Sequence, residues 1–166
     1  TNVSMMGETF KYVGAMAGTL GYSIKDVGIM IGLMANSGIK ASQAGTELNS
    51  IFTRLATSTN GATDAINELG IDFFDSSGKA RDLIVVVNEL RAATANYTDE
   101  QKSNIANTIA GTRAQAGLLA ILNASEDDYK DLTEAIYSAD GAAQAMADTM
   151  LDNLEGSIIK LQSALD

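Results

Sequence analysis

The chain contains no histidine, cysteine, proline or tryptophan, and only 5% of its 166 residues are aromatic. Without histidine and cysteine it has no imidazole or thiolate ligands for zinc, no disulfides and no imidazole-activated nucleophile. Because aromatic rings are few, the chain offers little surface on which bases or sugars could stack. Proline interrupts helices, so its absence indicates long helical segments. Together these absences exclude most of the common kinds of catalytic site.

Acidic side chains outnumber basic ones by 21 to 11, which gives the chain a formal net charge of −10. Phosphate backbones are bound by clustered lysine and arginine, so we expect no sequence-specific binding of nucleic acid. The charge is unevenly placed. Residues 1–60 contain only Lys11, Lys25, Lys40 and Arg54 against Glu8, Asp26 and Glu47. Residues 61–166 therefore carry almost all of the net negative charge.

The nearly neutral first part, residues 1–60, is rich in glycine and holds five of the seven methionines. Flexible methionine side chains are typical of adaptable apolar contacts. We therefore predict an apolar contact region in residues 1–60 beside an acidic, solvated region in residues 61–166. The alternative is that residues 1–60 supply more of an ordinary hydrophobic core.

The proportions of apolar residues (46%) and charged residues (19%) are typical of a folded globular protein. We treat residues 1–166 as a single domain. Its longest uncharged runs, Tyr12–Ile24 and Val27–Ile39, are each 13 residues long. A helix needs about 18–20 apolar residues to cross a bilayer, so neither run is long enough. Because the chain does not begin with methionine, we expect it to be a fragment of a longer protein.

Apolar spacing and capping residues predict a mainly α fold, a compact domain of about seven helices. Ser23 with Asp26 and Thr98 with Gln101 have the spacing of capping boxes, and Ser125 has the position of a further cap. A last helix through Asp166 is predicted from an apolar stripe formed by Met146, Met150, Leu154, Ile158 and Leu161.

The helical pattern is interrupted near residues 71–81, where we predict one short β-hairpin. Ile71–Phe74 is a brief extended run, and Asp75–Gly78 has the composition of a turn that leads back into Lys79–Arg81. The following segment, residues 83–95, is compatible with either helix or strand. Its leucine and valine residues have helical spacing, but Ile84–Val87 is a run that also suits a strand.

Three motifs resemble known chemical sites and fail on their details. Gly78-Lys79 lacks the preceding glycine and the following serine or threonine of a phosphate-binding loop. Asp72 and Asp75 lack the alternating ligands and terminal glutamate of a calcium loop, so a turn-forming aspartate explains Asp75 better. Glu126–Asp128 stands at a predicted helix N-terminus, where acidic residues favour the helix dipole. We therefore predict no catalytic, cofactor-binding or metal-binding residues and no enzymatic activity.

Two pairs of glycines, Gly14 with Gly18 and Gly28 with Gly32, lie four residues apart inside predicted helices. A glycine inside a helix costs about 1 kcal/mol relative to alanine. Small residues at this spacing allow two helix backbones to approach closely, which recovers stability through dense packing. We predict that these four glycines form a helix-packing surface. The packing would join the first two helices of one chain or, alternatively, two copies of the protein.

Five blocks of the sequence resemble the conserved core region of tail tape measure proteins from long-tailed bacteriophages and prophages. These blocks are Phe10–Ile24, Gly32–Ala56, Ile66–Leu83, Gly111–Ser125 and Asp140–Ile158. The stretches IKASQAGT (residues 39–46) and DSSGKAR (residues 75–81) are the most specific parts. The resemblance covers nearly the whole chain in the order of the family.

The resemblance implies a structural and assembly role. In the family, several copies of a long helical protein occupy the growing tail tube, and chain length sets tail length. The implied partners are further copies of the protein, the tail tube protein, tail assembly chaperones and tail-tip proteins. The implied location is the lumen of the virion tail, after assembly in the host cytoplasm. No cofactor and no catalytic residue are implied.

A straight helix of 166 residues would be about 250 Å long. The predicted helix breaks would instead fold the chain into a compact body with a radius of gyration near 15 Å. We therefore expect a docking or assembly element and not an extended measuring segment. The alternative function is a helical membrane-active module that helps to form a DNA passage in the host membrane. Uncharged runs of 13 residues would need to unfold or associate to act there.

Overall fold

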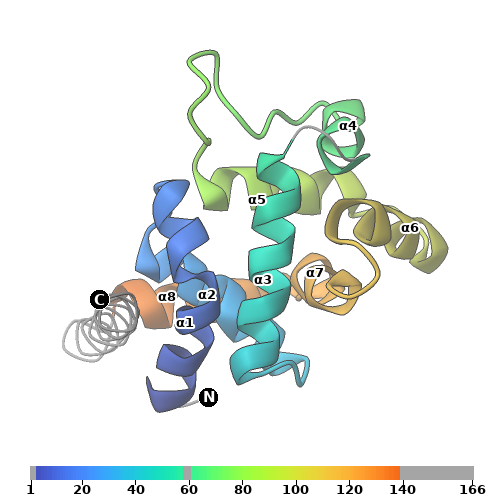
Figure 1. The fold of residues 1–166 in the computed structure, drawn as a ribbon. Coiled ribbons are helices and arrows are strands. Elements are labelled where there is room, and N and C mark those ends of the chain that lie inside the picture. The colour runs from blue at the N-terminus through green and yellow to red at the C-terminus, as the bar shows by residue number, and fades with distance from the viewer. Residues whose placement is uncertain (1–2, 58–60, 139–166) are drawn as a thin grey trace.

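The computed structural model describes residues 3–57 and 61–138, which form eight α-helices and no extended strand (Figure 1). The helices are α1 (Val3–Thr19), α2 (Ile24–Asn36), α3 (Ala41–Ala56), α4 (Gly61–Glu68), α5 (Leu83–Thr94), α6 (Asp99–Ala110), α7 (Gln115–Asn123) and α8 (Glu126–Ser138). The predicted mainly α class is confirmed, with eight helices in place of about seven. The predicted last helix through Asp166 lies outside the described residues.

Helix α2 forms the centre of the fold and contacts α1, α3, α5, α7 and α8. The stretch Val27–Met34 is apolar on every side of the helix, and all of it except Gly32 is buried. A helix with no polar face is stable in water only when other helices surround it. Most of the uncharged run Val27–Ile39 therefore lies in the core helix of the domain.

Helices α1 and α3 pack lengthwise against each other, as Figure 1 shows. The two helices lie so close at Gly45 in α3 that a Cβ atom there would overlap the backbone carbonyl oxygen of Thr9. The same Cβ would lie 3.0 Å from Cβ of Tyr12. Only glycine fits at this position, so Gly45 sets the distance between the two helix backbones.

Two arginines bind the carbonyl groups left unpaired at the ends of neighbouring helices. Arg54 in α3 donates to the carbonyl oxygens of Ile109 (2.9 Å) and Thr108 (3.0 Å) in the last turn of α6. Arg91 in α5 donates to the carbonyl oxygens of Ile121 and, at 2.8 Å, Ala124 at the end of α7. A cation at a helix C-terminus satisfies orphan acceptors and complements the helix dipole. The two arginines therefore join α6 to α3 and α7 to α5.

The predicted β-hairpin near residues 71–81 is wrong, because this segment contains a single antiparallel bridge between Phe74 and Ala80. The backbone nitrogens of Asp75 and Arg81 donate to the carbonyl oxygens of Lys79 (2.8 Å) and Phe73 (3.0 Å), and no ladder continues beyond them. A two-stranded ribbon without a neighbouring sheet is only marginally stable in water. The segment instead forms a loop that projects from the helices (Figure 1).

Side chains at both ends hold the projecting loop. Phe73 is buried in the core, and the guanidinium of Arg81 donates to the carbonyl oxygen of Asp72 at 2.8 Å and to both carboxylate oxygens of Glu89. At the tip, Oδ1 of Asp75 accepts hydrogen bonds from the hydroxyl and backbone nitrogen of Ser77 and from the nitrogen of Lys79. The interpretation of Asp75 as a turn-forming residue is therefore confirmed.

Residues 83–94 are helical, which resolves the alternative left open by the sequence. Asp82 caps this helix by accepting hydrogen bonds from the nitrogens of Ile84 (3.0 Å) and Val85 (3.2 Å). Without a sheet beside it, the β-branched run has no ladder to join. The predicted caps at Ser23 and Ser125 are confirmed, as is the reciprocal capping box of Thr98 and Gln101.

Replacing Gly45 by alanine should destabilise the domain, because a backbone atom blocks the space for the new methyl group. Overpacking of this kind typically costs about 1–3 kcal/mol. We expect the thermal midpoint to fall by about 3–10 °C. The matched control is Gly18→Ala in α1, where nothing lies within 4 Å of the new Cβ. Because alanine has the higher helix propensity, Gly18→Ala should stabilise the domain by about 0.5–1 kcal/mol. Equal effects of the two substitutions would contradict this account of the packing.

Stability should also depend on the ionisation of Asp75. The hydrogen bond from the Ser77 hydroxyl, followed by that from the Lys79 nitrogen, lowers the pKa of Asp75. A carboxyl group whose pKa is lower in the folded protein than in the unfolded chain stabilises the fold at pH values above its unfolded pKa. That stabilisation is lost as the pH falls through the folded pKa. For Asp75→Asn we expect a lower thermal midpoint at pH 7 and a smaller decrease between pH 7 and pH 2. Asp131→Asn, an exposed carboxylate that makes none of these bonds, should keep the wild-type pH dependence.

Candidate functional site

The described residues contain neither a metal-binding cluster nor a membrane-spanning helix. Within residues 3–57 and 61–138, no group of three or more acidic residues could hold a metal ion. In the same ranges, no helix is both long enough and apolar enough to cross a membrane. The candidate functional features are therefore surfaces and helix contacts.

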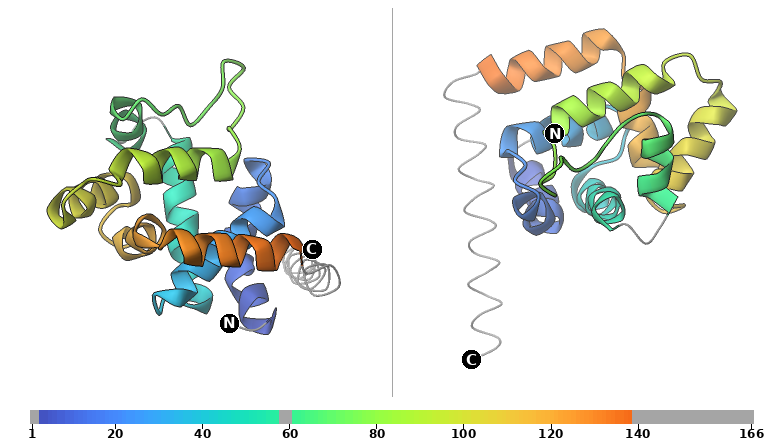
Figure 2. Two further views of the ribbon diagram at one scale, coloured as in Figure 1. Left: turned by 180° about the vertical axis from the view of Figure 1, so that it is seen from behind. Right: turned by 90° about the horizontal axis from the view of Figure 1, so that it is seen from above.

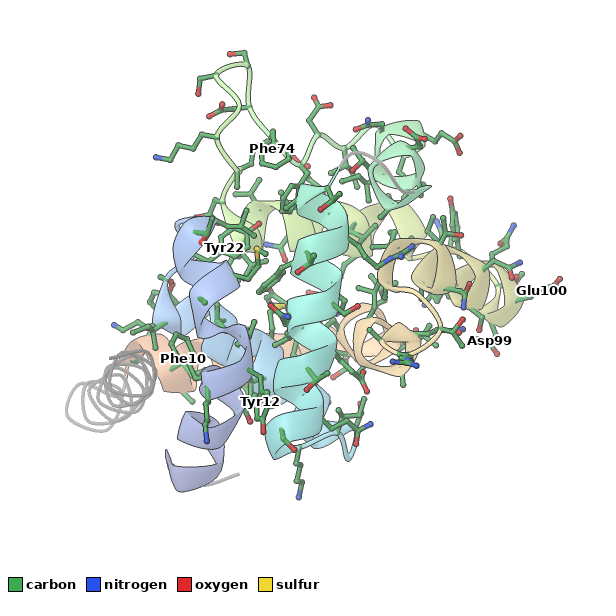
Figure 3. All side chains as sticks on the ribbon, viewed as in Figure 1. Phe10, Tyr12, Tyr22, Phe74, Asp99 and Glu100 are labelled. Atoms are coloured by element: carbon green, nitrogen blue, oxygen red, sulfur yellow. The ribbon has the colours of Figure 1, made fainter. Side chains whose placement is uncertain are left out.

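The acidic cluster at residues 126–128 lies in the first turn of α8, as predicted. The hydroxyl of Ser125 accepts a hydrogen bond from the nitrogen of Asp128 at 3.0 Å. Glu126 pairs with the buried guanidinium of Arg91 at 3.1 Å. At α6 the corresponding acids, Asp99 and Glu100, point into solvent (Figure 3). At α8, Glu126 therefore pairs with Arg91, and Asp127 and Asp128 lie in the first turn, where acidic residues favour the helix dipole.

The four glycines predicted as a packing surface lie in different surroundings. Gly14 and Gly28 are buried, whereas Gly18 is exposed and has nothing within 4 Å of its Cβ position. Gly32 faces α8, where a Cβ would come within 2.5 Å of Cδ2 of Leu132. Helix α1 packs mainly against α3. Whether these glycines also join copies of the protein stays a prediction.

Helices α5 and α8 enclose a groove at the surface, with α2 beneath it. The residues lining it are Asp26, Ile29, Asp82, Ile84, Thr133 and Tyr137. The hydroxyl of Tyr137 donates to Oδ1 of Asp26, and Nζ of Lys25 lies 5.1 Å from the centre of the Tyr137 ring. Burial, and then the hydrogen bond to Asp26, raises the pKa of Tyr137. The groove thus combines apolar surface, a tyrosine and two carboxylates.

A second cleft shares Asp26 and Asp82 with this groove and is also lined by Tyr22. Tyr22 points inward between α1 and α3 (Figure 3), with its ring 5.2 Å from that of Phe52. Its hydroxyl is buried and has no hydrogen-bond partner in the described part of the chain. Burial, with a smaller contribution from Asp82, raises the pKa of Tyr22.

Glu47 is a buried carboxylate in α3, only 6% exposed. Its Oε1 accepts a hydrogen bond from Nε2 of Gln43 at 3.0 Å, and its Oε2 has no partner among the residues that the structure describes. Oε2 lies against Gly117 of α7, beside Cε of Met34. This carboxylate and Gly117 mark a close contact between α3 and α7.

Sequence reasoning missed the residues that hold the helices together. Gly45 lies within the most specific family stretch, residues 39–46, but has no second glycine four residues away and so gave no spacing signal. Arg54 and Arg91 are isolated basic residues in apolar helix stripes, which is a weak sign of burial. Their partners are backbone carbonyls more than 29 residues away, which no local pattern reveals.

Comparison with known proteins identifies a family. Residues 1–111 match the family described as phage-related minor tail proteins. The chain is 37% identical over 163 residues to the tape measure protein of Pneumococcus phage Dp-1, an alignment that covers 98% of the chain and 14% of that protein. It is 29% identical over 164 residues to the probable tape measure protein of Escherichia phage P2, which covers 97% of the chain and 20% of that protein.

The chain thus spans one fifth or less of the length of these two relatives. No solved structure matches it. Both alignments extend over nearly the whole chain. The chain therefore belongs to the phage tape measure proteins of the phage-related minor tail protein family, which are components of phage tails.

Proposed function

We propose that this chain is a compact assembly module of the tape measure scaffold that sets tail length inside the tail tube. The observation that carries the proposal is its similarity to tape measure proteins over 98% of its length. The described helices are only 8–17 residues long and fold back on one another, so each contributes little length. A module of this shape suits docking better than measurement.

The proposed partners are other copies of the protein, the tail tube protein, tail assembly chaperones and tail-tip proteins. The proposed location is the lumen of the tail tube, with assembly in the host cytoplasm. The net charge of −10 supports this location, because an acidic surface does not adhere to DNA that moves along the tube. We propose no catalytic role.

In-frame deletion of these 166 residues from the phage gene should prevent tail formation, because the docking element would be lost. If the segment acted as part of the ruler, tails would instead be shortened by about 250 Å, the length of a 166-residue helix. Electron microscopy of lysates distinguishes the two results. The control is an equally long in-frame deletion elsewhere in the same gene, which should yield shortened tails. Shortened tails from both deletions would contradict the assembly role.

The purified 166-residue chain should neither release dye from liposomes nor release fragments from peptidoglycan. Its acidic side chains have no assigned catalytic pair, and its uncharged runs are shorter than a membrane span. Fluorescence dequenching and a reducing-sugar assay check the two expectations. Dye release would favour the membrane-active alternative, and peptidoglycan fragments would contradict the absence of a catalytic role.

A further inference from the structure

Helices α5 and α8 run side by side in opposite directions across α2 (Figure 2). The last turn of α5 lies at the start of α8, where Arg91 meets Glu126. The start of α5 lies at the end of α8, where Asp82 and Tyr137 line the same groove. The space between the two helices therefore has two ends, each lined by residues from both helices.

One end of this space is filled by an arginine side chain of the protein itself. Arg91 is 9% exposed, and its guanidinium lies 4.7 Å from the centre of the Tyr129 ring. The guanidinium also pairs with Glu126 and donates to two backbone carbonyls of residues 121 and 124. A tyrosine ring, a carboxylate and further acceptors thus hold one planar cation between α5 and α8.

The other end also presents a tyrosine ring and carboxylates, and no basic residue is among those that line it. Tyr137 of α8 is 47% exposed, Asp82 stands at the N-terminus of α5, and the 7%-exposed Asp26 comes from α2. Oδ1 of Asp82 accepts hydrogen bonds from two backbone nitrogens of α5, and Oδ1 of Asp26 accepts one from the Tyr137 hydroxyl. Oδ2 of each carboxylate has no hydrogen-bond partner in the ranges that the structure describes. Ile84 supplies an apolar wall, and Ile29 lies beneath it.

The basic side chains nearby lie outside the residues that line the groove. Lys25 lies over the Tyr137 ring, and Lys79 and Arg81 line the adjoining cleft. Arg81 is paired with Glu89, and Lys79 interacts with Asp75 at the tip of the projecting loop. The lining of the groove itself contains two aspartates and no lysine or arginine. The groove therefore complements a positively charged group with an apolar stem.

We propose that the open end of the space between α5 and α8 binds an arginine side chain presented by a partner protein. The aliphatic stem of arginine would pack on Ile84, and its planar guanidinium would bridge Oδ2 of Asp26 and Oδ2 of Asp82 beside the Tyr137 ring. Arginine suits this site better than lysine, because its planar fork both stacks on aromatic rings and bridges two acceptors. At the opposite end, Arg91 of the protein itself is bound in this way by a tyrosine ring and a carboxylate. This inference does not depend on the proposed assembly role, because the site could bind arginine whether or not the module starts tail assembly.

The test uses the ¹⁵N-labelled 166-residue chain titrated with N-acetyl-arginine amide, followed by two-dimensional NMR. The control probe is N-acetyl-citrulline amide, which has the same shape without the charge. We expect saturable shifts at the amides around Asp82 and Tyr137 with a Kd of about 1 mM, in keeping with a ligand of this size. Citrulline should leave these amides unchanged.

Two variants and a matched control locate the binding. Asp82→Asn keeps a good helix cap, and Asp26→Asn keeps an acceptor for Tyr137, so both should fold as the wild type does. Each should weaken binding of the arginine probe at least fivefold, whereas Asp131→Asn on the exposed face of α8 should leave it unchanged. Equal shifts with citrulline, equal weakening by Asp131→Asn, or no saturable shift up to 20 mM probe, about twenty times the expected Kd, would overturn the proposal. If Asp26→Asn does not fold, Asp82→Asn alone decides.

Discussion

Burial of the apolar helix α2 is the constraint on which the rest of the fold depends. Val27–Met34 has no polar side, so helices must cover it in every direction. Helices α1, α3, α5, α7 and α8, which come from both halves of the sequence, provide that cover. Described residues of both regions, the nearly neutral one and the acidic one, consequently contribute to one core.

Surrounding one helix with several short ones creates many helix ends close to the core. The terminal carbonyls of each helix need partners, and buried carbonyls without them are costly. Arg54 and Arg91 supply those partners over long sequence distances, while Gly45, Gly32 and Gly117 let backbones or side chains approach closely. Dense contacts of this kind stabilise the fold of a chain that has no cysteine to form disulfides.

The same features connect the fold to the family. The chain has no histidine and no cysteine, and the proposed assembly role would not require them. Its distinctive surface chemistry lies where α2, α5 and α8 meet, at two aspartates and a tyrosine. Their arrangement is suited to recognition, and the arginine at the opposite end of the α5–α8 space shows how the protein itself uses similar groups.

Local patterns and short specific stretches were enough to predict the helical class, the turn at Asp75, the family, and the caps at Ser23, Thr98 and Ser125. The helix over residues 83–94 and the loop over residues 71–81 became clear only from the fold, since a strand requires a neighbour that no local pattern can supply. The roles of Gly45, Arg54 and Arg91 and the pairing of Asp26 with Tyr137 likewise emerged only from the fold. Each of these depends on a partner distant in sequence, which is brought into contact when the helices surround α2.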